Sequence, residues 1–149
     1  MNSVHYVGMD VDKAKIVLAR LGAGNAKEVQ EHVVANTRSA VKKYFNALLA
    51  GAEVHASYEA GCFGFGLYRQ LTEMGVAVLV AAPGLIPRKP SDRVKTDRRD
   101  ARSIALALRA GQFSSRWPGK PAKCDSQSAW FFEHAVRELS HFYIMETAA

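Results

Sequence analysis

The chain has 149 residues, of which 48% are hydrophobic and 23% are charged, and its net charge is +6. This balance is typical of one globular domain and excludes a largely disordered chain; a membrane span is excluded because the longest apolar run covers only residues 76–82. The N-terminus shows no signal-peptide pattern, and the two cysteines form neither a disulfide framework nor a metal-ligand spacing, so we expect a cytoplasmic protein.

Three strands are predicted at the start of the chain. Residues 4–10 and 15–21 are apolar runs with only a few residues between them, which indicates a hairpin. Residues 27–35 are more polar, and this favours a third strand at an edge of the sheet.

The hydrophobic period then changes to that of a helix. Five apolar residues recur at helical spacing: Val41, Tyr44, Phe45, Leu48 and Leu49. Asn36 or Thr37 can cap the start of this helix, and Gly51 follows its end.

Two further units, each a strand followed by a helix, complete the pattern. Residues 54–59 alternate in hydrophobicity as a fourth strand, and residues 61–75 predict a second helix. The continuous apolar run at 76–81 predicts a central parallel strand, and a third helix covers about residues 97–110. The order βββ-α-β-α-β-α predicts an α/β fold with one mixed five-stranded sheet and helices on both faces.

Charge and aromatic content divide the chain near residue 116. Residues 1–116 carry 17 Lys or Arg against 10 Asp or Glu, whereas residues 117–149 carry 3 against 4. The last segment also holds 6 of the 14 aromatic residues. We therefore expect a basic domain at 1–116, suited to a nucleic-acid partner, and a divergent aromatic-rich tail at 117–149.

Four carboxylates are expected to meet at one edge of the sheet. Asp10 ends the first strand and Glu59 ends the fourth, so parallel pairing would place both at the carboxyl edge, where open α/β sheets bind ligands. Asp97 and Asp100 share a face at the start of the third helix, in line with its apolar stripe. Mg²⁺ favours carboxylate oxygens together with water and substrate phosphate, and two such ions can promote phosphodiester cleavage.

A purely structural interpretation of these acids stays open. Asp97 can serve as an N-cap, and Asp100 can be a first-turn acid that favours the helix dipole. Asp10 and Glu59 can be ordinary residues at strand ends.

A run of basic residues borders the expected metal site. It comprises Arg88, Lys89, Arg93, Lys95, Arg98, Arg99 and Arg102. Charge runs are commonly solvated faces, but beside a metal site these side chains suit contact with a phosphate backbone.

Four short motifs resemble those of a known family. They are G-M-D-V-D-K at 8–13, Y-E-A-G at 58–61, A-P-G-L-I-P-R-K-P at 82–90 and R-V-K-T-D-R-R-D-A at 93–101. Together they resemble the DEDD transposases, the insertion-sequence family called one-ten, whose N-terminal domain looks like the Holliday-junction resolvase RuvC. The resemblance covers about residues 4–116 and implies a ribonuclease H-like fold.

The resemblance also implies an activity. Asp10, Glu59, Asp97 and Asp100 would form a catalytic tetrad that binds Mg²⁺, for which Mn²⁺ can substitute. The enzyme would be a DNA transposase or recombinase that cleaves and exchanges DNA strands with a structured guide RNA. It would act as a homo-oligomer in a bacterial or archaeal cytoplasm, with no membrane partner.

The chain departs from that family after Arg116. Family members are longer and carry a C-terminal domain with a serine nucleophile, for which this chain offers no matching motif. We therefore expect a truncated protein that is incomplete alone, with residues 117–149 arising from a frameshift or a broken element.

Other functions are kept beside this one. The chain can be a non-catalytic remnant that binds nucleic acid or transposase subunits, or a metal-dependent nuclease that needs no guide. A sugar-kinase-like ATPase is disfavoured, because it needs a glycine-rich turn where Val11, Asp12 and Lys13 stand.

Overall fold

The computed structural model describes residues 3–22, 28–59, 65–81 and 97–112. Its elements follow the predicted order. The strands are β1 (Ser3–Val11), β2 (Lys15–Gly22), β3 (Val29–Ala35), β4 (Ala52–Glu59) and β5 (Ala77–Ala81). The helices are α1 (Arg38–Leu49), α2 (Phe65–Glu73) and α3 (Asp97–Arg109). Within these ranges, no helix combines the length and the hydropathy needed to cross a membrane.

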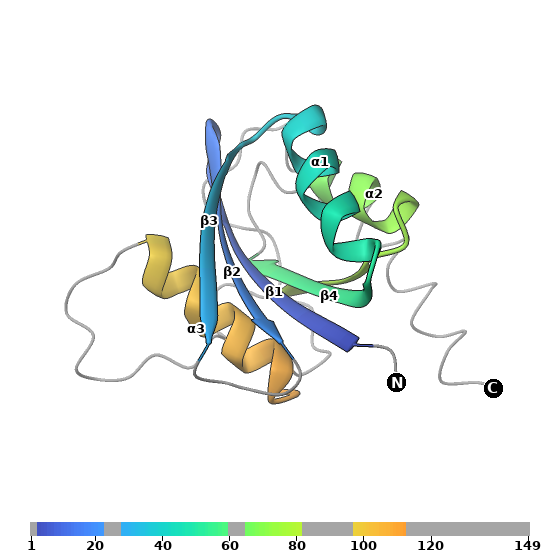
Figure 1. Cartoon of the computed structure of the whole chain (residues 1–149). Coiled ribbons are helices and arrows are strands. Elements are labelled where there is room, and N and C mark those ends of the chain that lie inside the picture. The colour runs from blue at the N-terminus through green and yellow to red at the C-terminus, as the bar shows by residue number, and fades with distance from the viewer. Residues whose placement is uncertain (1–2, 23–27, 60–64, 82–96, 113–149) are drawn as a thin grey trace, which may run out of the picture.

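The strands form one mixed sheet in the order β3-β2-β1-β4-β5. β2 is antiparallel to both β1 and β3, whereas β1, β4 and β5 are parallel to one another. α1 and α2 cover one face of this sheet and α3 covers the other (Figure 1). The predicted fold class, an α/β fold with one mixed five-stranded sheet and helices on both faces, is therefore confirmed.

The two outer strands differ in how well the sequence predicted them. β3 lies at an edge as expected, and most of its side chains are exposed. The prediction that the apolar run at 76–81 forms a central strand is wrong, because β5 is outermost in the described sheet. Its apolar character has another cause: Val78 and Val80 pack against the main core, and α2 contacts the strand.

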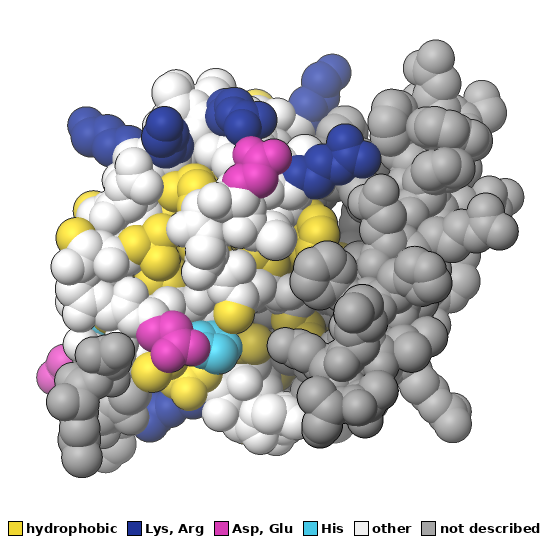
Figure 2. Space-filling view, turned by 90° about the vertical axis from the view of Figure 1, so that its right-hand side faces the viewer, with side chains coloured by type: hydrophobic (Ala, Val, Ile, Leu, Met, Phe, Trp, Pro, Cys, Tyr) yellow, Lys and Arg dark blue, Asp and Glu magenta, His cyan; other side chains and the backbone are white. Residues whose placement is uncertain are grey.

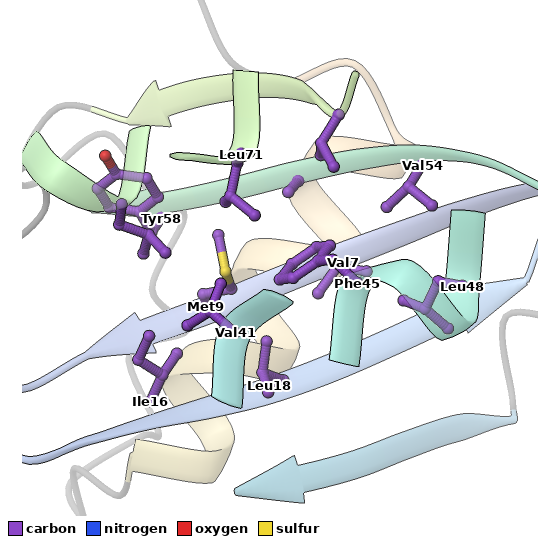
Figure 3. Packing of buried hydrophobic residues seen from close by; sticks show 13 residues of the cluster. Val7, Met9, Ile16, Leu18, Val41, Phe45, Leu48, Val54, Tyr58 and Leu71 are labelled. Carbon is purple, nitrogen blue, oxygen red and sulfur yellow. The ribbon is translucent and has the colours of Figure 1, made fainter. Parts of the chain in front are cut away.

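The main core lies between the sheet and the helices α1 and α2. The predicted stripe of α1 is buried there through Val41, Phe45 and Leu48. Figure 3 shows Phe45 lying against Val7 of β1, in the middle of this cluster. The helix begins where predicted, because the Thr37 hydroxyl accepts a hydrogen bond from the backbone N–H of Ala40 at 3.3 Å.

α3 approaches the opposite face of the sheet at very short range. A Cβ atom placed on Gly8 of β1 would lie 2.1 Å from the carbonyl oxygen of Ala101 and 2.3 Å from the backbone nitrogen of Ala105. No side chain fits in that space, so the helix backbone rests directly on the strand at Gly8. Ala101 and Ala105 are fully buried and also pack against the β2 residues Val17, Ala19 and Leu21.

We expect the substitution Gly8→Ala to lower the free energy of unfolding by about 3 kcal/mol, because the added methyl group must push α3 away from β1. Urea denaturation measures this loss. Gly22→Ala is the matched control, since its Cβ would meet no atom within 4 Å and the stability should stay within about 0.5 kcal/mol. Similar losses for the two variants would contradict the close approach.

Candidate active site

β1 and β4 end side by side at the carboxyl edge of the sheet. Their parallel register pairs Gly8 with Ser57 and Met9 with Tyr58. The next residues along the two strands are Asp10 and Glu59, which both still belong to their strands. The expectation that these strands are adjacent and parallel is therefore confirmed, and the two acids stand at the same level on neighbouring strands.

Asp10 and Glu59 lie on the face of the sheet that α3 covers. Gly8 contacts α3 directly, and alternate residues of one strand share a face, so Asp10 is on the same side. Residues that pair between β1 and β4 lie on the same face of the sheet. Glu59 is the neighbour of Asp10 on β4, so it also lies on the face that α3 covers. Val17, which pairs with Asp10 on β2, packs in the cluster beneath α3.

α3 brings a third described carboxylate to this region. Asp100 immediately precedes Ala101, the residue whose carbonyl oxygen lies against Gly8. The Asp100 side chain is half-buried, whereas that of Arg102 is exposed, so the two point to different surroundings. In Figure 1 the first turn of α3 lies toward the end of the molecule where β1 finishes.

The complete tetrad stays a prediction. In the described part of the chain, no group of three or more His, Cys, Asp or Glu side chains is placed to hold a metal ion. Asp97 begins α3, but its side chain lies outside the described residues. Mg²⁺ is commonly held by only one or two carboxylates, with water and substrate phosphate completing its shell, so the Asp10 and Glu59 pair suits such an ion.

The predicted basic run and the tail are only partly described. Arg98 and Arg99 belong to the first turn of α3, with side chains outside the description, and Arg102 is exposed on the same helix. The remaining members of the run lie outside the described residues: Arg88, Lys89, Arg93 and Lys95. The same holds for residues 113–149, so the domain boundary at 116 also stays a prediction.

One buried polar residue near the two acids was not predicted from the sequence. Ser57 is fully buried, and its hydroxyl has no hydrogen-bond partner among the described residues. It pairs with Gly8, so two small residues lie side by side beneath α3. A serine inside an apolar strand gives no signal in the sequence, and its place depends on the register of β4 with β1.

Two curated transposases are similar to this chain. It is 41% identical over 106 residues to the transposase for insertion sequence element IS1533 of Leptospira borgpetersenii, which covers 70% of this chain and 31% of that protein. It is 45% identical over 118 residues to y4qE of Sinorhizobium fredii, named as a candidate transposase, covering 75% of this chain and 29% of that protein. The chain thus spans less than a third of the length of these relatives. The resemblance to insertion-sequence transposases is confirmed, and the finer DEDD, one-ten assignment stays a prediction.

Other comparisons are weaker. No protein-family model matches the chain. The solved catalytic core domain of BIV integrase shares 15% sequence identity, with a TM-score of 0.36 over 90% of this chain and 97% of that one. That likeness is too weak to relate individual residues.

We expect a double-mutant cycle of Asp10→Asn and Glu59→Gln to show an unfavourable coupling of about 0.5–1 kcal/mol in metal-free protein, because like charges on neighbouring strand positions repel. Urea denaturation at low salt measures it, and the cycle cancels every other partner of either acid. The control cycle joins Asp10→Asn with Glu53→Gln, near the opposite end of β4, and should show no coupling. A favourable or absent coupling between Asp10 and Glu59 would contradict their proximity.

Proposed function

We propose that the chain is the metal-binding part of a DEDD-type insertion-sequence transposase of the one-ten family. Asp10, Glu59, Asp97 and Asp100 hold Mg²⁺, or Mn²⁺ in its place. The observation that carries this proposal is the parallel register of β1 and β4, which sets Asp10 beside Glu59 on the face covered by α3. Similarity to curated insertion-sequence transposases supports DNA as the substrate.

The chain contributes rigidity and charge to this chemistry. A bound divalent metal supplies activation of the attacking oxygen and stabilisation of the leaving oxygen of a phosphodiester. Asp10 and Glu59 stand on paired strands, and the contact of Gly8 with Ala101 fixes the helix that carries Asp100. Carboxylates on such rigid elements keep a constant spacing, which metal-assisted cleavage requires.

The basic residues hold the substrate in this proposal. The exposed Arg102, together with Arg98 and Arg99, lies on the same helix as Asp100. Arg88, Lys89, Arg93 and Lys95 precede that helix and extend the positive charge. Lys and Arg contacts to phosphates position a nucleic acid without reading its sequence.

The rest of the proposal follows the family resemblance. The DNA strands are cleaved and exchanged under the direction of a structured guide RNA, in a homo-oligomer. Because the chain matches less than a third of the length of its relatives, we assign to it the metal-dependent step and not the whole recombination.

We expect Mg²⁺ to stabilise the parent protein and not Asp97→Asn. A ligand that binds only the folded state adds about 2.7 kcal/mol at one hundred times its Kd. Thermal and urea denaturation with and without Mg²⁺ or Mn²⁺ measure the effect. Glu53→Gln is the control, since this exposed acid lies away from the carboxyl edge and should leave the stabilisation intact. Equal stabilisation of parent and Asp97→Asn would refute the assigned ligand, and none in the parent would favour a non-catalytic binding remnant.

We also expect the chain alone, with Mn²⁺ and duplex DNA but no RNA, to leave the DNA uncut, because the proposed reaction depends on a guide. Gel analysis of an end-labelled duplex is the measurement. Cleavage that disappears in Asp97→Asn would establish a guide-independent nuclease and overturn the guided reaction. Cleavage that persists in Asp97→Asn would reveal a contaminating nuclease in the preparation, and the assay would be repeated after its removal.

A further inference from the structure

We propose that a second basic surface, on the α1 side of the sheet, binds the phosphate backbone of the DNA substrate. We call it the α1 basic surface. It consists of Lys13, Arg38, Lys42, Lys43 and Arg69. The proposal rests on the function proposed above and adds a binding site on the face opposite α3.

A pair of hydrogen bonds brings the first members of this surface together. The turn after β1 carries Lys13, and Asn36 holds that turn from the segment that leads into α1. The Asn36 backbone N–H donates a hydrogen bond to the backbone carbonyl oxygen of Ala14 at 3.0 Å. The Asn36 side-chain amide donates a second one to the backbone carbonyl oxygen of Asp12 at 2.7 Å. Arg38 begins α1 two residues after Asn36, so it lies beside the turn.

α2 adds to the same surface. The buried Gln70 donates a hydrogen bond from its side-chain amide to the carbonyl oxygen of Arg38 at 2.7 Å, which fixes α2 against the start of α1. The Arg38 guanidinium also lies 3.0 Å from a carboxylate oxygen of Glu73. Arg69 precedes Glu73 by four residues and therefore lies on the same face of α2, one turn away.

The positive charge of α1 is poorly neutralised by the described residues. α1 carries three basic residues and no acidic one. The only ion pair that α1 forms with a described residue joins Arg38 to Glu73, and their side chains are 75% and 64% exposed, so solvent screens it. Lys42 and Lys43 are exposed and form no ion pair with any described residue. Figure 2 shows the basic side chains gathered along the upper border of the face formed by α1 and α2.

The α1 basic surface borders the candidate active site. Lys13 follows Asp10 by three residues, in the turn at the carboxyl edge of the sheet. α1 and α3 lie on opposite faces, so a phosphate backbone that crosses this edge meets basic residues on both sides (Figure 1). Exposed lysines such as Lys42 and Lys43, which form no ion pair with a described residue, are suited to a polyanion and read no sequence.

The test measures binding of the full chain to a duplex DNA of arbitrary sequence, in EDTA, by fluorescence anisotropy over a series of salt concentrations. We expect Lys42→Gln/Lys43→Gln to bind at least about tenfold more weakly at 0.1 M salt, and the slope of log affinity against log salt to fall by about two. Lys42→Arg/Lys43→Arg should keep both quantities near the parent values, because the charge is retained.

A control variant with the same change in net charge distinguishes DNA binding at the α1 basic surface from a general attraction between DNA and a positively charged protein. Ala110→Glu/Gln112→Glu also lowers the net charge by two, at exposed positions after the end of α3, the helix on the opposite face of the sheet from α1. We expect it to weaken binding much less than the glutamine pair. Equal losses, or no loss in the glutamine pair, would overturn the proposal.

Two further measurements show whether the surface binds DNA or RNA, and whether its role is independent of metal binding. If the glutamine pair loses affinity for a structured RNA but not for duplex DNA, the surface serves RNA and the DNA proposal falls. Stabilisation by Mg²⁺, measured on the same variant, should equal that of the parent, because Lys42 and Lys43 hold no metal. A parent that shows no metal effect while the glutamine pair still loses DNA binding would overturn the metal-dependent function and leave the DNA surface standing.

Discussion

The contact between the backbone of α3 and β1 at Gly8 is the constraint on which the arrangement of the acids depends. At this point the helix lies so near the strand that no side chain fits between them. Asp10 follows Gly8 by two residues, and Asp100 precedes Ala101, which makes the contact. One packing interaction therefore sets the position of a strand carboxylate and of a helix carboxylate at once, and the small residues around it are required by the site as much as by the core.

Most of the fold was predictable because periodicity reports burial. The apolar stripe at helical spacing predicted α1, and the alternation of apolar and polar residues predicted β4. Thr37 predicted where α1 begins. The place of β5 was not predictable in this way, since an apolar run indicates that a strand is covered but not how many strands flank it. Order within a sheet depends on long-range pairing, for which local sequence carries no signal.

The functional residues, too, fall into those that local sequence can predict and those that only the folded chain brings together. Asp10 and Glu59 could be predicted because the ends of their strands are visible in the sequence. The only further assumption is that the two strands are parallel neighbours, and the structure shows that they are. The α1 basic surface was missed because its members come from a turn and two helices and form no continuous run. Hydrogen bonds of Asn36 and Gln70 bring these parts together, and such contacts exist only in the folded chain.

The two partners of the central strand β1 lie at very different separations along the chain. Its pairing with β2 closes over a three-residue turn, whereas its pairing with β4 must wait for a partner about fifty residues further along the chain. On a ribosome, the β1–β2 hairpin can therefore form long before Glu59 emerges. Asp10 and Glu59 become neighbours only when this late pairing closes, so in a nascent chain the two carboxylates stay apart until the central strand has neighbours on both sides.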